Sequence, residues 1–496
     1  MKFDIGKRDN DNVVLNKGQE AAVTNLIDFI AAPFDARNNI QALCGAGGVG
    51  KTFVTKYVID HCKFSSSMIH CAAPTHKACR VLSNATKHRV ETIQKIFGFR
   101  LDVNIEDFDP NNPAFNPIGG VKITELNCRV LIIDEASMLN RALVNYISRY
   151  CARQKIKIIV IGDDSQLSPV NEAVSSAFKM AVKINRLTEI VRQDDDNPIR
   201  TLLDILRKDI KNKTYNFLTY INNHRRNVID GKGYVVVGID DFTELVARAF
   251  SNKDFEKNVD LNRCIAYTNG AVGIWNRYVR NSIIQSAEKS ILNNNDLIMS
   301  YVTIVDEFND IIISNSEDYI IRDILNFTDS DYGFKGFMVK FQAIHGGAIT
   351  KPLFIINHTD QSTFITYCQE LKYLIDDAKA ASKEMAASKW KKYFAFKRKY
   401  LILTDVRDNL GNIVFKRDID YGFALTSHKS QGSTYKNVFV DVNDMVYDKN
   451  GHPYTDADDL RRRLYVACSR ASNFLVLRYG YCLLYTSPSP RDRSVS

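Results

Sequence analysis

A glycine-rich turn, Gly45-x-x-x-x-Gly50-Lys51-Thr52, constrains the fold of this 496-residue chain more than any other feature. An apolar run at 40–44 precedes it and an apolar-periodic segment follows from Phe53, so the turn joins a buried strand to a helix. Glycines let successive backbone N–H groups point into one concavity, where a Cβ would obstruct close approach. The helix N-terminus favours negative charge there. The turn therefore predicts a phosphate-binding loop in an α/β fold.

Side chains in and near this loop have expected roles in binding a magnesium nucleotide. Lys51 is expected to reach the β- and γ-phosphates, and the Thr52 hydroxyl to ligate Mg²⁺. Gln19 precedes the loop, at the start of an amphipathic segment, and is either a solvated helix cap or an amide that pairs with the adenine edge. The residues expected to line the nucleotide site are Gln19, Gly45, Ala46, Gly47, Gly48, Val49, Gly50, Lys51, Thr52 and Phe53.

Two further apolar runs end in polar side chains suited to hydrolysis. The run at 129–133 delivers Asp134 and Glu135, a pair that can divide labour: Asp134 binds magnesium, and Glu135 orients and deprotonates the attacking water. A kinase acting on a metabolite has no use for the second carboxylate, so hydrolysis is favoured over phosphoryl transfer. The run at 156–162 leads to Gln166, whose amide can sense the γ-phosphate.

Composition sets the broad class. At this length two to four domains are expected, and 45% apolar with 25% charged residues is typical of a globular protein. No run of about 18 apolar residues is present and the first ten residues are polar, which predicts no membrane span, no secretory signal and a cytoplasmic location. The 10 cysteines include no C-x-x-C pair, which argues against a zinc ribbon or a disulfide framework. A net charge of +9 is a mild signal for a polyanionic partner.

Polar segments in the first half suggest nucleic-acid contacts. The strand-like run at 68–73 ends in Pro74-Thr75-His76-Lys77, whose side chains suit phosphate and base contacts, although an ordinary helix cap and first turn explains them too. Prolines at 110–117 rule out a helix and predict a projecting loop. Phe115 in this loop either wedges against bases or packs onto the domain. Arg192 is a surface residue by default, yet its guanidinium suits γ-phosphate contact from a neighbouring domain.

The second half reads as another α/β unit with an insertion. A strand at 263–267 leads to Asn269, and a later strand, loop and helix carry Ser427, His428, Lys429 and, further on, Arg470. Period-two alternation across 297–362 predicts an inserted β-subdomain. The basic and aromatic segment 383–400 is either a strand-binding or bracing element, or a core-facing aromatic stripe with a solvated basic back. A membrane-surface helix is a third reading.

Taken in order, these motifs resemble the superfamily 1B DNA helicases, most closely the RecD-like branch with its Dda-like phage helicases. The resemblance covers about residues 13–478. It implies two RecA-like P-loop NTPase domains, each a parallel sheet flanked by helices, with a small wedge insertion in the first and an SH3-like β plus helical insertion in the second. Two residues depart from the usual pattern: Gln94 stands where histidine is usual, and Ser469 replaces the common threonine but keeps the hydroxyl.

The resemblance also implies an activity: ATP- and Mg²⁺-dependent translocation on single-stranded DNA, 5′ to 3′, with unwinding of forked duplex by a monomer in the host cytoplasm. Replication or recombination proteins are its implied partners. The alternatives are a DNA-stimulated ATPase that translocates without unwinding and a nucleotide-gated DNA-binding protein. By motif match the catalytic residues are Lys51, Glu135, Gln166, Arg192 and Arg470, and the metal ligands are Thr52 and Asp134. The implied DNA contacts are Pro74, Thr75, His76, Lys77, Thr92, Phe115, Asn269, Ser427, His428 and Lys429.

The expected organisation has five parts. Residues 1–190 form the first RecA-like domain with a wedge at about 95–125, and 191–300 begin the second. Residues 301–401 form the inserted subdomain, and 402–481 complete the second domain. The segment 482–496 resembles a translated sequencing adaptor and is expected to be a non-native tail.

Overall fold

The computed structural model describes residues 15–99, 108–110, 126–167, 169, 172, 175–189, 196–284, 287–306, 310–408 and 410–480. The chain divides into two compact units. The first unit comprises 1–195 and 284–423, and the second comprises 196–283 and 424–496. The five-part organisation expected from the sequence stays a prediction.

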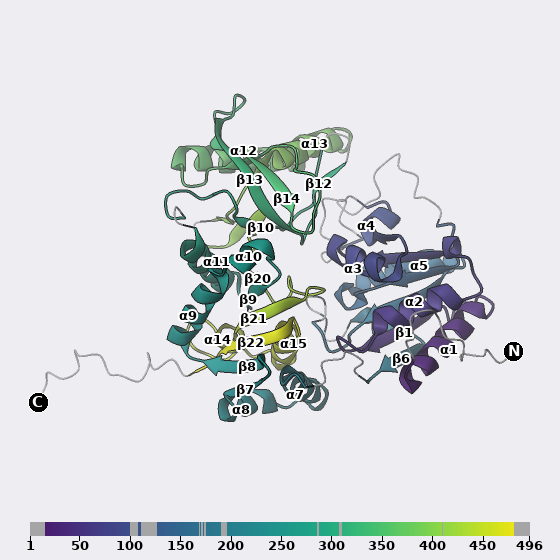
Figure 1. The fold of residues 1–496 in the computed structure, drawn as a ribbon. Coiled ribbons are helices and arrows are strands. Elements are labelled where there is room, and N and C mark those ends of the chain that lie inside the picture. Colours follow the sequence, from purple (N-terminus) through teal and green to yellow (C-terminus); the bar gives the residue numbers. More distant parts are fainter. Residues whose placement is uncertain are drawn as a thin grey trace, which may run out of the picture. The chain divides into compact units, whose positions relative to one another are not determined.

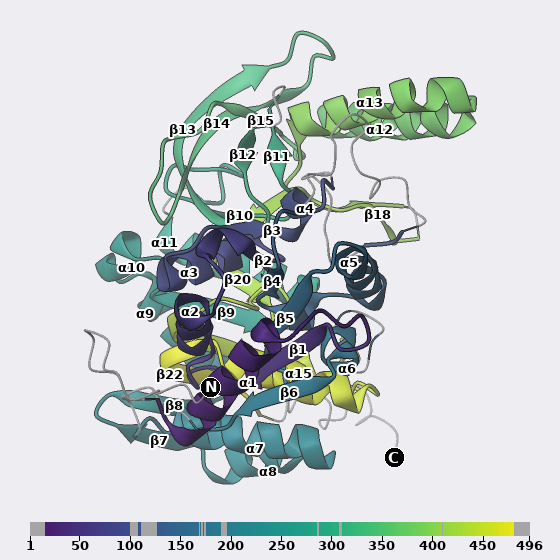
Figure 2. The same cartoon turned by 90° about the vertical axis from the view of Figure 1, so that its right-hand side faces the viewer.

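The nucleotide-loop sheet of the first unit has six parallel strands in the order β3-β2-β4-β5-β1-β6. Figure 1 labels β1 and β6 of this sheet, and Figure 2 labels all its strands. Its strands are β1 (Ile40–Gly45), β2 (Ile69–Ala73), β3 (Val90–Thr92), β4 (Val130–Ile133), β5 (Lys157–Gly162) and β6 (Lys183–Leu187). The helical elements are α1 (Lys17–Ala31), α2 (Lys51–His61), η1 (Ser66–Met68), α3 (His76–Thr86), α4 (Ile93–Ile96), η4 (Ala136–Met138), α5 (Arg141–Arg153) and α6 (Ser176–Met180).

Both faces of this sheet are covered, which explains why its central strands read as continuous apolar runs. Successive side chains of β1 point to opposite faces, so Leu43 packs in the cluster that includes α1 and α2, while Ala42 and Cys44 pack in the cluster that includes α5. Because all six strands are parallel, the segments after β1, β2, β4 and β5 leave the sheet at one edge, the usual ligand edge of α/β folds.

The first unit also contains a curled mixed sheet in the order β16-β15-β14-β13-β10-β19 (Figure 2). Its strands are β10 (Leu297–Ser300), β13 (Asp318–Thr328), β14 (Lys335–Ala343), β15 (Leu353–Ile356), β16 (Tyr400–Leu401) and β19 (Ile419–Tyr421). Two small ribbons accompany it, formed by β11 (Ile304–Val305) with β12 (Ile311–Ile313), and by β17 (Val406–Arg407) with β18 (Ile413–Phe415).

Helices α12 (Gln361–Ala380) and α13 (Lys383–Lys399) form a hairpin beside this sheet (Figures 1 and 2). Phe396 of α13 is 6% exposed and packs with Tyr367 and Leu371 of α12. Three lysines of α13 pair with nearby carboxylates: Lys389 with Asp377, Lys397 with Asp418, and Lys399 with Asp331. Phe396 therefore faces the core beside α12, as the reading of segment 383–400 as a core-facing aromatic stripe predicts, while three of the basic side chains are paired with carboxylates.

The sheet of the second unit has the order β20-β9-β21-β22-β8-β7, and only β7 is antiparallel to its neighbour. Its strands are β7 (Arg226–Ile229), β8 (Lys232–Val237), β9 (Asn262–Ala266), β20 (Ala424–Thr426), β21 (Tyr435–Asp441) and β22 (Ala471–Arg478). The helices are α7 (Ile199–Asn212), α8 (Asn216–Asn223), α9 (Ile239–Phe250), α10 (Lys253–Lys257), α11 (Asn269–Ile283), α14 (Val442–Val446) and α15 (Ala457–Cys468).

Two parallel sheets flanked by helices, with an added curled mixed sheet, confirm the predicted α/β fold class. The nine cysteines that the structure describes are all free thiols, in keeping with the sequence-based exclusion of a disulfide framework. Within the described ranges, no helix combines the length and apolar character needed to cross a membrane.

Candidate functional site

The phosphate-binding loop connects β1 to α2 and depends on its glycines. Gly48 and Gly50 have φ values of +84° and +85°, in the left-handed region that favours glycine. A Cβ on Gly45 would lie 2.7 Å from the Leu187 carbonyl oxygen, too close for any side chain. The loop conformation therefore requires glycine at each of these three positions.

Lys51 begins α2 and places its ammonium across this loop. The Nζ atom donates hydrogen bonds to the carbonyl oxygens of Gly45 at 2.7 Å and Ala46 at 2.9 Å. Thr52 and Phe53 follow in the first turn of α2, and all three side chains are half-buried. The positive charge thus lies at the concavity where phosphate is expected.

Asp134 and Glu135 follow β4 at the same sheet edge. Asp134 Oδ1 accepts a hydrogen bond from the backbone N–H of Glu135 at 2.8 Å. Burial raises the pKa of Asp134, while this hydrogen bond and the nearby charge of Lys51 oppose the rise. Lys51 and Asp134 are therefore close enough to interact, as a magnesium nucleotide site requires.

Glu135 has a left-handed backbone, with a φ of +49°. A residue with a side chain pays about 1 kcal/mol or more for this conformation, and such residues cluster at functional sites. Gln166 lies in the turn after β5 and is 6% exposed, and its backbone N–H donates to the Asp163 carbonyl at 3.1 Å. Since β5 lies between β1 and β4, the sheet brings Lys51, both carboxylates and Gln166 to one edge.

Gln19 is a buried cap that also contacts the phosphate-binding loop. Its Oε1 accepts from the Asn16 N–H at 3.2 Å, completing a capping box at the start of α1. Its Nε2 donates to the Val49 carbonyl at 3.2 Å, and the side chain is only 2% exposed. Gln19 is thus a helix cap, as one of the two sequence interpretations has it, but its side chain is buried against the loop and not solvated. Pairing with adenine stays a prediction.

The predicted DNA contacts of the first unit follow β2 and β3, which are adjacent parallel strands. The hydroxyls of Thr75 and Thr92 cap α3 and α4, accepting from Ala78 N at 3.2 Å and Lys95 N at 3.3 Å. Pro74 is buried, and so is Gln94, which is 9% exposed within α4. The hydroxyls therefore have local roles whether or not they also contact DNA.

His76 and Lys77 lie in the first turn of α3. Burial and, to a lesser extent, the charge of Lys95 lower the pKa of His76, which keeps its imidazole neutral at pH 7. The Lys77 ammonium is 3.8 Å from Asp318 at the start of β13, and its side chain is 12% exposed. Lys77 is thus paired with a carboxylate of the mixed sheet in this conformation.

The predicted DNA contacts of the second unit lie at a comparable edge. Asn269 begins α11 after β9, and Ser427, His428 and Lys429 follow the adjacent parallel strand β20. Ser427 is fully buried and its Oγ donates to the Ala266 carbonyl at 3.3 Å, whereas His428 and Lys429 are half-buried. His428 and Lys429 are therefore more accessible than Ser427 for contact with a bound strand.

Arg470 is held by the same unit. Its guanidinium donates to the Ser433 carbonyl at 3.1 Å, to the Val466 carbonyl at 3.1 Å and to the Ser469 hydroxyl at 2.8 Å. The residue is 7% exposed. Ser469, which departs from the expected pattern, thus supplies its hydroxyl as an acceptor for Arg470. Phe115 and Arg192 lie outside the described residues.

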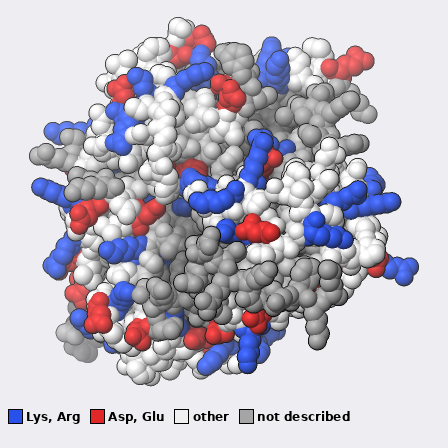
Figure 3. All heavy atoms as spheres, turned by 45° about the vertical axis from the view of Figure 1, so that its right-hand side comes forward, with Lys and Arg blue, Asp and Glu red and all other residues white. Residues whose placement is uncertain are grey.

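Charge on the face drawn in Figure 3 is mixed. Lysine and arginine side chains are spread over the surface with aspartate and glutamate among them. Among the described residues on that face, basic and acidic side chains alternate, in keeping with the modest net charge of +9.

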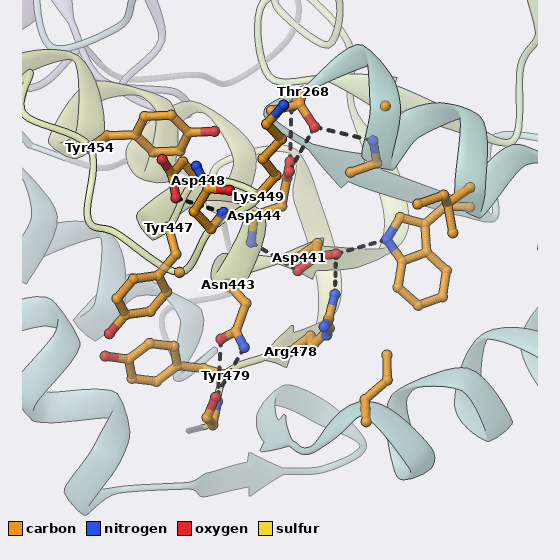
Figure 4. Close-up of a pocket in the computed structure, with 18 of the residues that line it drawn as sticks. Thr268, Asp441, Asn443, Asp444, Tyr447, Asp448, Lys449, Tyr454, Arg478 and Tyr479 are labelled. Carbon is orange, nitrogen blue, oxygen red and sulfur yellow. Dashed lines mark hydrogen bonds and ion pairs between the residues drawn. The ribbon is translucent and has the colours of Figure 1, made fainter. Parts of the chain in front are cut away.

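A cavity of about 1500 Å³ lies at the carboxyl edge of the second sheet (Figure 4). Its lining includes Thr268, Asp441, Asp444 and Arg478, and it lies wholly within the second unit. Asp441 and Asp444 were not singled out from the sequence. They stand at and just after the end of an apolar strand, β21, which is the same signal that singled out Asp134. Their contacts are with neighbouring parts of this unit.

Two segments of the chain match known protein families, and several known proteins resemble it in sequence. Residues 14–225 match the family described as AAA domain, and 421–477 match the UvrD-like helicase C-terminal domain. The uncharacterized protein R530 of Acanthamoeba polyphaga mimivirus is 23% identical over 529 residues, covering 93% of this chain and 99% of that protein. The ATP-dependent DNA helicase dda of Enterobacteria phage T4 is 27% identical, over 56% of this chain and 59% of the relative.

The ATP-dependent RecD2 DNA helicase of Deinococcus radiodurans is 28% identical over 37% of this chain and 23% of the relative. Among solved structures, Bacteroides Pif1 helicase with ADP-AlF3 and ssDNA aligns with a TM-score of 0.48 at 16% identity, covering 94% of this chain and 92% of that one. The fold and the loop define a P-loop α/β protein whose segment 421–477 is similar to a UvrD-like helicase C-terminal domain. The curated relatives that resemble the chain include DNA helicases named dda and RecD2, each matched over less than two thirds of its own length.

Proposed function

We propose that this protein is an ATP-dependent DNA helicase that moves along single-stranded DNA, 5′ to 3′, and unwinds duplex at forks. The observation that carries the proposal is the set of side chains at one edge of the first sheet. A phosphate-binding lysine, a half-buried carboxylate beside it and a second carboxylate in a strained backbone suit hydrolysis of a nucleoside triphosphate. The similarity to the dda and RecD2 proteins, which are described as ATP-dependent DNA helicases, supports DNA as the track.

The residues present fit a magnesium nucleotide. A threonine hydroxyl and a carboxylate are hard oxygen ligands, as Mg²⁺ prefers, and Mg²⁺ commonly takes its remaining ligands from phosphates and water. Among the described residues, no group of three or more His, Cys, Asp or Glu could hold a metal without such help. Thr52 and Asp134 would therefore hold the ion together with the nucleotide, and its charge would offset that of the phosphates.

Each remaining side chain has a defined task in this proposal. Lys51 exchanges its two carbonyl contacts for phosphate oxygens, and Glu135 takes a proton from the attacking water. Gln166 contacts the γ-phosphate, and Arg192 and Arg470 add positive charge to it. Binding therefore favours a closed arrangement of the two RecA-like domains, and hydrolysis releases it.

Contacts to DNA complete the motor. Pro74, Thr75, His76, Lys77 and Thr92 grip the strand from one domain, and Asn269, Ser427, His428 and Lys429 grip it from the other. Alternating these grips with closure moves the protein along the strand, and Phe115 acts as the wedge. Because lysine–phosphate contacts release counterions, affinity for DNA falls as salt rises.

Single-stranded-DNA-stimulated ATP hydrolysis tests this proposal. Glu135→Gln removes the base and is expected to lower turnover by about 100-fold or more, while binding of a fluorescent ATP analogue is retained. Glu244→Gln, in an exposed side chain of the second unit, is the matched control and should leave turnover unchanged. Undiminished turnover in Glu135→Gln would overturn the assigned chemistry.

A further inference from the structure

The turn between β9 and α11 is held by a single carboxylate from another part of the second unit. Asp444 Oδ2 accepts from the backbone N–H groups of Tyr267 at 2.7 Å and Thr268 at 2.8 Å. Asp444 Oδ1 accepts from the Thr268 hydroxyl at 2.7 Å. These three contacts immediately precede Asn269, the first residue of α11.

Thr268 connects Asp444 to the first turn of α11. Its Oγ1 accepts a hydrogen bond from the Ala271 N–H at 3.1 Å, as an N-capping side chain does. The same hydroxyl therefore donates to Asp444 and accepts from α11, so the turn and the first residues of the helix are fixed as one piece. Figure 4 shows the two residues facing each other at the cavity rim.

Asp444 is itself held firmly. Its backbone N–H donates to Asp441 Oδ1 at 3.2 Å. The other oxygen of Asp441 accepts from Trp275 Nε1 at 2.9 Å and from Arg478 Nη1 at 2.6 Å (Figure 4). Asp444 is thus anchored through Asp441 to α11 and β22.

The chemistry explains why a carboxylate stands here. Three donors converge on two oxygens, and aspartate can accept from all three, whereas asparagine offers one acceptor oxygen and an NH₂ group. Hydrogen bonds to an ionised acceptor are roughly twice as strong as neutral ones. Burial raises the pKa of Asp444, and the bonds from Thr268 and Tyr267 oppose that rise.

We propose that Asp444 is a positioning residue for DNA binding: it sets the backbone of the 267–269 turn so that Asn269 lies beside the loop carrying His428 and Lys429. The strands β9 and β20, which support these two segments, are adjacent and parallel. The inference rests on the proposed function, because Asn269 and the 427–429 loop are its DNA contacts in this unit. Asp444 acts on DNA affinity and not on the ATP chemistry.

The test is the dependence of ATP hydrolysis on the concentration of single-stranded DNA. Asp444→Asn removes the charge and one of the two acceptor oxygens, so the Thr268 hydroxyl can no longer donate here, and is expected to raise the DNA concentration for half-maximal turnover by about tenfold. The rate at saturating DNA should stay within about twofold of the unsubstituted protein. A purely structural role would lower the saturating rate or the melting temperature instead.

Asp448→Asn is the matched control. Asp448 also lines the cavity, but its carboxylate accepts from the backbone N–H groups of Asn450 and His452, in a turn of its own, and not from the 267–269 turn. Its half-saturating DNA concentration should therefore equal that of the unsubstituted protein.

Thr268 supplies a milder, independent test if Asp444→Asn folds poorly. Thr268→Ser keeps the hydroxyl and should behave normally, whereas Thr268→Val should weaken DNA activation in the same way as Asp444→Asn. Because both changes break one linkage, the double variant should lose no more than the stronger single variant.

The possible results distinguish failure of the proposed role of Asp444 from failure of the proposed function. Unchanged half-saturation in both Asp444→Asn and Thr268→Val, with normal stimulation by DNA, would overturn the role of Asp444 alone. An equal fall of saturating rate and affinity in Thr268→Val but not in Thr268→Ser would also overturn it. Absence of any DNA stimulation in the unsubstituted protein would overturn the proposed function and, with it, this inference.

Discussion

At the residue scale, Gln19 links the start of α1 to the phosphate-binding loop. Both ends of its amide are engaged, one with Asn16 and one with Val49. A Cβ on Gly50 would lie 2.6 Å from Gln19 Nε2, so the absence of a side chain at Gly50 makes room for this contact. The conformation of the loop and the position of the amide are therefore coupled.

Gln19→Ala should raise the KM for ATP by about tenfold and reduce discrimination against GTP, because the amide that is expected to read adenine is removed. Asn16→Ala is the control, since it breaks the same capping box at a cost of about 0.5–2 kcal/mol while leaving the Gln19 amide in place. Steady-state kinetics with both nucleotides measure the difference. Equal changes in the two variants would mean that Gln19 is only a cap.

The sequence predicted the residues of this site because their signals are local. A glycine pattern with strand before and helix after, and a carboxylate pair ending an apolar run, identify Lys51, Asp134 and Glu135 without knowledge of the fold. The contacts of Gln19 were not predictable in this way. They depend on which rotamer packs best between α1 and the loop, and both readings of a lone glutamine fit the same sequence.

At the element scale, α3 and the mixed sheet of the first unit share two ion pairs. Arg80 Nη1 lies 2.8 Å from both carboxylate oxygens of Glu317, and Lys77 is 3.8 Å from Asp318. Glu317 is 5% exposed and Asp318 is 1% exposed. Lys77 is an expected phosphate contact. In this conformation its ammonium is paired with the buried carboxylate of Asp318, which therefore competes with DNA for it.

Asp318→Asn should strengthen binding of single-stranded DNA by a few fold, because Lys77 no longer leaves a carboxylate in order to contact phosphate. Asp323→Asn on the same strand is the control, as Asp323 pairs with Lys340 at an exposed site. Fluorescence anisotropy of a labelled oligonucleotide at fixed salt measures both variants. Weaker binding in Asp318→Asn would show that the pair orients Lys77 toward DNA instead of masking it.

In helix α13, composition does not predict which side chains pair with carboxylates and which pack in the core. From the sequence, its lysines and aromatic residues fitted a strand-binding or bracing element nearly as well as a core-facing aromatic stripe with a solvated basic back. The structure pairs Lys397 with Asp418 and packs Phe396 against α12, and Asp418 is distant in sequence from most of that helix. Such pairings arise from tertiary packing, so the sequence pattern alone left both readings open.

At the scale of the whole molecule, the chain carries two parallel sheets of the kind that supports RecA-like domains, with a curled mixed sheet added. The parallel strands were predictable because each is an apolar run that ends in polar residues. The strand order was not, because it depends on pairing between segments far apart in the chain. In our proposal, Arg470 adds positive charge to the γ-phosphate bound in the other domain, and this contact drives closure.

The central claim is that hydrolysis at Lys51, Asp134 and Glu135 drives directional movement that separates strands. Displacement of a labelled strand from duplexes with a 5′ tail, a 3′ tail or blunt ends tests it most directly, in the presence and absence of ATP. We expect ATP-dependent displacement from the 5′-tailed duplex, little from the 3′-tailed or blunt duplexes, and none with Glu135→Gln. DNA-stimulated ATP hydrolysis without displacement from any of these duplexes would contradict the claim.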